Sequence, residues 1–220
     1  MLLLQLFING LASGALYALT AVGFALIYNG TRIFHIAHGA VFTFGGYALY
    51  LCAVPLGLPW IVALPAAILA TAGFGALMDA LVYRPLRKRS TGPAGMFIAS
   101  IGALTCAQAV YALVFGTDTV NLHQGGLPTF DIGEVTVTAV HVIAAIVALV
   151  VFPVLQLFLS RTRWGRAIRA LADNPKLAVA RGIDVERLYL LIFALGSALA
   201  GLAVVIIAFD LGVRPDLGFT

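Results

Sequence analysis

Long runs without charged residues dominate the sequence. Asp, Glu, Lys and Arg are all missing from residues 1–31, 33–78, 90–117, 135–160 and 188–209. A helix that crosses a bilayer needs about 20 mostly apolar residues, so the run 33–78 can hold two such helices and each other run one. The pattern therefore predicts six membrane-spanning helices.

The predicted fold class is all-α, a polytopic membrane protein with a single transmembrane domain over residues 1–220. The expected spans are Leu2–Ile27, Ala37–Val54, Trp60–Val82, Gly95–Phe115, Ala139–Leu159 and Leu188–Asp210. Only 10% of the residues are charged and the mean hydropathy is +1.05, whereas a soluble domain carries roughly 25% charged residues. The first run lacks the basic start of a secretory signal, so we expect it to remain as a span.

The basic residues predict the orientation of these spans. Every Lys and Arg except Arg214 falls in one alternating set of connections, at Arg32, at 84–89 and at 160–187. Basic residues near span ends stay in the cytoplasm, so the N-terminus is expected outside and the loop Ser160–Arg187 inside. The outer connection 116–138 has no basic residue; its acidic residues are Asp118, Asp131 and Glu134.

The net charge of +4 follows from these same loops. Basic bands between spans report topology rather than a nucleic-acid partner, so none is expected. Cys52 and Cys106 lie in separate runs without the spacing of a metal or redox site, and we expect both to be small buried residues.

Small and polar residues share faces of the predicted helices. Gly10 with Gly14, and Ser197 with Gly201, are four residues apart and allow close helix packing. The polar positions on one face of the first span are Asn9, Ser13 and Tyr17. These lie at i, i+4 and i+8, so they form one polar stripe. The stripe either packs against other helices or lines a translocation pathway.

Ionisable residues inside the spans are few. His35 and His38 are three residues apart at the start of the second span; a metal site would need a third ligand, so a structural hydrogen-bonding role is expected and no metal. Asp79 is expected to pair with Arg84, which reduces the cost of burying the carboxylate. Asp210 lies at the opposite face, so a proton-coupled secondary carrier is poorly supported.

The cytoplasmic loop 160–187 predicts two short helices. The Ala-rich stretch Arg166–Ala172 favours the first, and Asp173 or Asn174 can cap a second with Pro175 in its first turn. Gly182 is expected to end it. A helix of about two turns is unstable alone in water, so it must pack against something. A protein partner, accommodated by small residues such as Ala178, and a surface of anionic lipid are both possible.

The chain also resembles the permeases of branched-chain amino acid ABC transporters over essentially its full length. The matching motifs are Asn9-Gly10-Leu11 with Gly14 and Tyr17-Ala18-Leu19; Ala37-His38-Gly39; Tyr83-Arg84-Pro85-Leu86-Arg87; Thr162-Arg163-Trp164-Gly165-Arg166-Ala167; Asp173, Asn174, Pro175, Ala178, Gly182 and Ile183; and Phe193-Ala194-Leu195-Gly196-Ser197-Ala198-Leu199-Ala200-Gly201.

The resemblance implies a non-enzymatic permease subunit in a bacterial inner membrane. It implies a second permease, cytoplasmic subunits that hydrolyse ATP and a periplasmic substrate-binding protein as partners, with no cofactor on this chain. The implied ATPase-coupling residues are Arg166, Asp173, Asn174, Pro175, Ala178, Arg181 and Gly182. Asn9, Ser13 and Tyr17 are the candidates for the pathway, and His38, Asp79 and Arg84 for boundary roles.

Some alternatives stay open at this stage. Related permeases carry urea and short amides, so the resemblance does not fix the solute. A self-sufficient secondary carrier and a metalloenzyme using His35 and His38 are the rival classes. Similar permeases continue beyond the segment 212–219 into further spans, so a chain that stops at Thr220 is expected to be truncated or split.

Overall fold

The computed structural model describes residues 2–122, 129–132 and 135–218. Its long helices are α1 (Leu2–Thr31), α2 (His38–Ala53), α3 (Trp60–Met78), α5 (Pro93–Phe115), α6 (Ala139–Arg161) and α9 (Val185–Leu211). Short helices connect them: a π-helical turn η1 (Asp79–Tyr83), α4 (Arg84–Lys88), α7 (Arg163–Asp173) and α8 (Pro175–Ala180). The all-α prediction is confirmed.

The six predicted spans become five full-length helices and one short one. Within the described residues, the helices long and apolar enough to cross a membrane are Gln5–Thr31, Trp60–Lys88, Pro93–Phe115, Ala139–Arg161 and Val185–Leu211. The predicted span Ala37–Val54 is α2, whose 16 residues cover about 24 Å, less than the hydrocarbon core of a bilayer of about 30 Å. Charge-free length alone could not reveal that the first part of this run is not helical.

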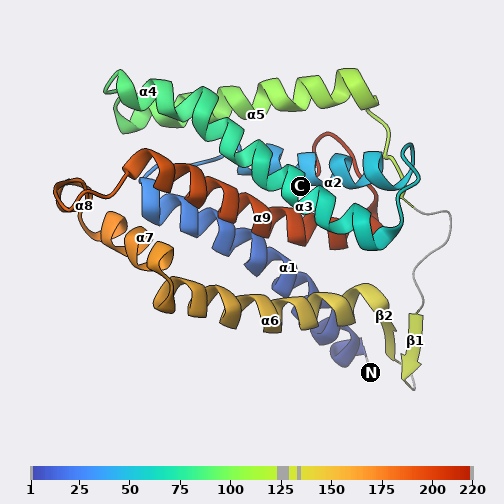
Figure 1. The fold of residues 1–220 in the computed structure, drawn as a ribbon. Coiled ribbons are helices and arrows are strands. Elements are labelled where there is room, and N and C mark those ends of the chain that lie inside the picture. Colours follow the sequence, from blue (N-terminus) through green and yellow to red (C-terminus); the bar gives the residue numbers. More distant parts are fainter. Residues whose placement is uncertain (1, 123–128, 133–134, 219–220) are drawn as a thin grey trace.

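The helices have two distinct ends in space. Figure 1 shows the short helices α4, α7 and α8 at one end of the bundle and the strands β1 (Thr129–Ile132) and β2 (Val135–Thr138) at the other. The basic connections therefore gather at the α7–α8 end, as the alternating charge pattern requires. We call the opposite end the hairpin end.

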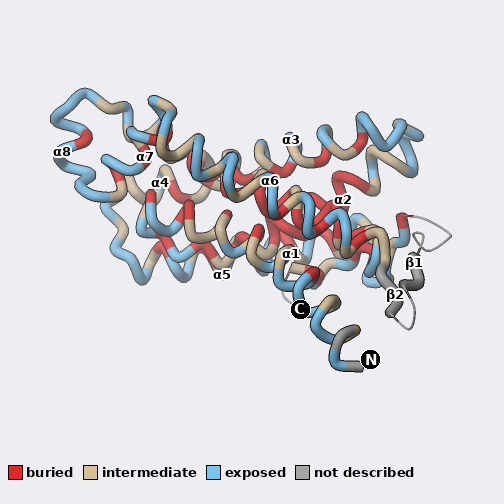
Figure 2. The backbone as a smooth tube through the Cα atoms, turned by 90° about the horizontal axis from the view of Figure 1, so that it is seen from below, coloured by how far each residue is buried: buried red, intermediate tan, exposed pale blue. Residues whose placement is uncertain are grey.

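The centre of the bundle is formed by α9, which packs against α1, α2 and α3. Buried positions lie along the inner faces of these helices, whereas the outward faces are exposed (Figure 2). Many exposed positions are large and apolar, among them Ile61, Leu113 and Leu149. A surface of this kind suits lipid, where an apolar side chain loses nothing by facing outward.

Glycine allows the closest helix contacts, though not at every predicted position. A Cβ at Gly23 would lie 2.5 Å from the carbonyl oxygen of Gly196, and one at Gly201 would lie 2.9 Å from Thr71. The close packing expected at Gly201 is therefore confirmed. A Cβ at Gly10 or Gly14 meets nothing within 4 Å, so this pair packs no helix within the described residues and that prediction is wrong here.

Two other expectations need correction. The connection 116–138 contains the antiparallel pair β1 and β2, with Thr129 opposite Thr138. The sequence pattern did not predict this pair. Glu134 lies outside the described residues. Cys106 is exposed rather than buried, and Cys52 is partly buried.

Candidate functional site

The chain between α1 and α2 is not helical, yet it is built into the bundle. Ile33, His35 and Ala37 are almost fully buried. Non-helical backbone in a membrane protein is tolerated only where its polar groups find partners inside the protein. Here Ile33 N donates to Thr31 Oγ1 (3.2 Å) and Ile36 N to the carbonyl of Phe34 (3.1 Å). We call residues 32–37 the break.

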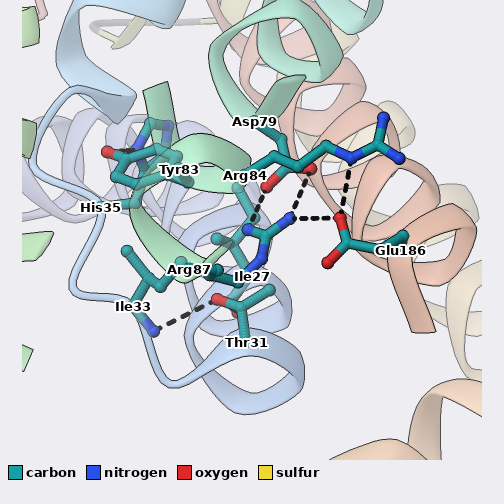
Figure 3. A network of polar contacts seen from close by, with 9 residues as sticks. All are labelled: Ile27, Thr31, Ile33, His35, Asp79, Tyr83, Arg84, Arg87 and Glu186. Atoms are coloured by element: carbon teal, nitrogen blue, oxygen red, sulfur yellow. Dashed lines mark hydrogen bonds and ion pairs between the residues drawn. The ribbon is translucent and has the colours of Figure 1, made fainter. Parts of the chain in front are cut away.

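A chain of buried hydrogen bonds anchors the break to α5 and η1. The backbone N–H of Ala37 donates to Ser100 Oγ (2.9 Å), and Tyr83 Oη donates to the same oxygen (2.9 Å). Tyr83 Oη also lies 2.7 Å from His35 Nδ1, and Figure 3 shows this pair side by side. If the Tyr83 hydroxyl donates to Ser100, His35 Nδ1 donates to Tyr83 and Nε2 accepts; if Ser100 donates to Tyr83, the roles of the two ring nitrogens are exchanged.

The break opens onto a groove along α1. A cavity of about 400 Å³ lies between α1, the break and the start of α2, and both His35 and His38 line it. A second cavity of about 320 Å³ extends from it toward Asp210. Tyr17, Phe42 and Leu217 border both cavities, so the two adjoin along α1; we call them together the groove.

The polar stripe of α1 is only partly in this groove. Ser13 lines the second cavity and Tyr17 both. Asn9 lines neither; it accepts a hydrogen bond from Gln5 Nε2 (2.9 Å) one turn earlier. The groove therefore brings together two of the three predicted pathway residues.

A second non-helical segment, residues 212–218, closes one side of the groove. After α9 it pairs with Val120 through Val213 and turns back to the start of α2. Gly218 N donates to Thr43 Oγ1 (3.0 Å). A Cβ at Gly39 would lie 2.5 Å from the Gly218 carbonyl oxygen, so glycine at position 39 permits this contact between the two backbones.

Four charged residues connect α3, η1 and α4 with α9 near the α7–α8 end (Figure 3). Asp79, whose side chain is fully buried, accepts from both Nη atoms of Arg87 at 2.5 and 3.1 Å. The carboxylate of Glu186 accepts from Arg87 (3.2 Å) and lies 3.1 Å from Arg84 Nε. We call these residues the ion-pair cluster.

The predicted pairing of Asp79 with Arg84 is wrong. Asp79 begins the π-helical turn η1, and Arg87, eight residues later, supplies its partner instead. The guanidinium of Arg87 also lies 4.4 Å from the ring centroid of Tyr189. Neither Arg87 nor Glu186 is predicted as a site residue from the sequence, although Arg87 is part of the family motif. A π-helical turn and a contact between residues 99 positions apart leave no periodic pattern in the sequence.

The loop 160–187 folds into the two helices expected from its sequence. Thr162 caps α7 by accepting from Gly165 N (2.9 Å), and Asn174 caps α8 by accepting from Leu177 N (3.0 Å). Gly182, with φ of +78°, follows α8. The prediction of an Asn174 cap, Pro175 in the first turn and a Gly182 stop is confirmed as local structure; docking to a partner stays a prediction.

The exposed face of α8 differs from the one expected. Ala178 is 3% exposed and belongs to an apolar cluster with Leu171 and Leu188, so it packs within this chain. Leu177 and Val179 are 54% and 60% exposed. The other candidate coupling residues are all exposed: Arg166, Asp173, Asn174, Pro175, Arg181 and Gly182.

These features define a polytopic membrane protein in which a buried non-helical connection between two helices borders a groove, and backbone of this kind is tolerated at membrane depth where it is buried or lines a cavity. Residues 6–220 match the family described as "Branched-chain amino acid transport system / permease component". The chain therefore belongs to this family of transporter permease subunits, which are not enzymes. No solved structure gives a significant match.

Named relatives share the description. The high-affinity branched-chain amino acid transport system permease protein BraD of Pseudomonas aeruginosa is 30% identical over 239 residues, covering 98% of this chain and 74% of BraD. LivH of Escherichia coli K12, with the same description, is 28% identical over 98% of this chain and 74% of its own length. A probable branched-chain amino acid transport permease, LivH of Methanocaldococcus jannaschii, is 27% identical, covering 92% and 65%.

No metal site is visible among the described residues, which contain no group of three or more His, Cys, Asp and Glu placed to hold an ion. His35 and His38 form a ring pair with centroids 5.7 Å apart. The metalloenzyme alternative therefore has no structural support in the part of the chain that the structure covers.

Proposed function

We propose that this chain is the membrane permease subunit of an ABC importer that brings branched-chain amino acids or similar small solutes into the cell. The observation that carries the proposal is the groove along α1, because it is bordered by two non-helical segments, the break and residues 212–218. The relatives named for branched-chain amino acid transport support this substrate class over urea or short amides.

The groove is the proposed translocation pathway. Ser13 and Tyr17 supply hydroxyls along a wall that also contains apolar residues such as Leu16, Phe42 and Ile207, which suits the brief passage of a small polar solute. Residues Asp210 and Arg214 are placed at its entry on the hairpin end. Under the orientation expected from the basic loops, this end faces the periplasm, where a substrate-binding protein would deliver the solute.

The α7–α8 end is the proposed site of coupling to cytoplasmic ATPase subunits. The side chains of Leu177 and Val179 project from α8 into solvent, and apolar residues on an exposed short helix are typical of a protein interface. The basic residues Lys176 and Arg181 adjoin them in the sequence, and Arg166 is exposed on the neighbouring helix α7. A second permease would complete the assembly, and the inner membrane of a bacterium is the proposed location.

Reconstitution tests the proposal. The permease with its partner subunits in proteoliposomes should take up labelled leucine only when ATP and the binding protein are present. Leu177→Asp and Val179→Asp should abolish co-purification of the ATPase, because a carboxylate cannot be buried in an apolar docking groove. Lys176→Asp, on the same helix, is the matched control for charge alone. Uptake without any ATPase would refute the proposal and favour a secondary carrier.

Cysteine labelling tests the pathway. In a background with Cys52 and Cys106 replaced, single cysteines at Ser13 and Tyr17 should react with a water-soluble thiol reagent faster than one at Leu11, which lies on the same helix but not in the groove. Leucine should slow the reaction at Tyr17. Equal labelling at all three positions would remove α1 from the pathway.

A further inference from the structure

The cavity at the break contains polar atoms that nothing in the described structure satisfies. His38 is 5% exposed and His35 fully buried, and both line the cavity. By strict geometry neither ring nitrogen of His38 has a partner, although the backbone of Thr20 lies near enough to hydrogen-bond one of them. His35 Nε2 also has no partner. Buried polar groups usually have partners, so unsatisfied nitrogens on two neighbouring rings at one cavity point to a ligand.

The two imidazoles present different chemistry to the cavity. His35 Nε2 is an acceptor in the tautomer whose Nδ1 donates to Tyr83. A neutral His38 has one ring N–H donor and one acceptor nitrogen. In that tautomer the site has an acceptor and a donor on neighbouring rings 5.7 Å apart.

The start of α2 adds a partial positive charge on the same side as His38. His38 is the first residue of this 16-residue helix. The N-terminus of a helix favours a negative group through its dipole. The N–H groups of His38 and Gly39 donate to the carbonyls of His35 and Ile36, so a carboxylate beside His38 would be favoured by the dipole and would bond to the ring N–H.

The rest of the cavity is apolar and aromatic. Phe24 lies 5.1 Å from Phe34 and 6.2 Å from His38, measured between ring centroids. Phe42 and Leu217 extend this apolar surface, which can accommodate an aliphatic side chain. Tyr17 and Thr20 also line the cavity, and the Thr20 hydroxyl donates to the carbonyl of Leu16 within its own helix.

We propose that this cavity binds the solute itself, as a zwitterionic α-amino acid with an aliphatic side chain. The α-carboxylate accepts from His38 at the start of α2, the α-ammonium donates to His35 Nε2, and the side chain lies against Phe24 and Phe42. The inference rests on the proposed function and adds that the permease, and not only its binding protein, selects the solute.

Direct binding tests the site. The purified permease with its partner permease and ATPase subunits, without binding protein or nucleotide, is titrated with labelled leucine in a scintillation proximity assay. Leucine should bind saturably. Leucinol, which lacks the carboxylate, and 4-methylpentanoate, which lacks the ammonium, should compete at least tenfold more weakly, about the effect of one hydrogen bond to a charged group.

Variants separate recognition from folding. His38→Phe should weaken leucine binding about tenfold or more, whereas His38→Gln, which retains a donor, should recover part of it. His141→Phe is the matched control, because His141 lies on α6 and lines neither cavity. The unfolding temperature of each variant is measured alongside, and a His38→Phe protein as stable as the His141→Phe control makes the comparison one of binding.

The outcomes distinguish this inference from the proposed function. ATP-driven uptake by the wild-type complex with no saturable leucine binding at millimolar concentration would overturn the inference and leave the proposed function standing. Equal competition by leucinol, or unchanged binding in His38→Phe, would also overturn it. Failure of the wild-type complex to take up any branched-chain amino acid would instead refute the proposed function.

Discussion

Replacing Arg87 with Met should be far more destabilising than removing the other acidic partner of this guanidinium. Arg87 bonds to both oxygens of Asp79, at 2.5 and 3.1 Å, and Asp79 has no exposed side-chain surface. Arg87→Met fills the space of the aliphatic stem but leaves a buried carboxylate without its cation, which costs about 3–5 kcal/mol. Glu186 is 36% exposed, so Glu186→Gln should cost no more than about 1 kcal/mol.

A double variant isolates the charge. In Asp79→Asn/Arg87→Met no uncompensated charge remains buried, so the double variant should be more stable than Arg87→Met alone, by several kcal/mol. The free energy of unfolding is measured by titrating the purified protein in mixed micelles with SDS and following tryptophan fluorescence. If Arg87→Met stays within about 1 kcal/mol of the wild type, or the double variant is no more stable than the single one, the buried pair does not stabilise this end of the bundle.

Three further predictions concern helix packing and the break. Gly196→Ala places a Cβ 2.6 Å from the Gly23 carbonyl oxygen. In the same SDS titration it should destabilise the protein by about 1–3 kcal/mol. Gly10→Ala, whose Cβ has nothing within 4 Å, should leave stability unchanged. Ser100→Ala removes the acceptor of two buried donors and should cost about 1–3 kcal/mol for each donor left unpaired; a loss below that range would mean water takes the place of the hydroxyl. Gly39→Ala should slow leucine uptake in proteoliposomes without lowering expression, because its Cβ collides with the Gly218 backbone beside the groove. Normal uptake would show that this backbone contact is not needed for transport.

Features written into consecutive residues could be predicted from the sequence. The Asn174-Pro175 start and Gly182 stop of α8 are local chemistry, because a cap, a fixed φ and a left-handed residue act within one or two turns. The positions of the long helices followed from apolar length. The family was also evident from motifs spread along the chain, and the match over residues 6–220 agrees with it.

Features that depend on distant residues could not be predicted from the sequence. Most of the break is apolar, as a helix in this chain would be, and it persists because Ser100 and Tyr83, from two other elements, supply hydrogen-bond partners to Ala37 and His35. Ala178 looked like a small residue left clear for a partner, yet its size serves packing under α7 and α9. In each case the deciding contact joins elements whose mutual placement no local pattern encodes.

Arg32 links α7 to the break. It follows α1 in a left-handed conformation, with φ of +58°, and its Nη2 donates to the carbonyl of Ala172 in the last turn of α7 (3.2 Å). Arg32 is also the first residue of the break, six positions before the start of α2. A displacement of α7 would therefore pull on the non-helical backbone at its first residue, as well as on α1 and α9 through direct packing.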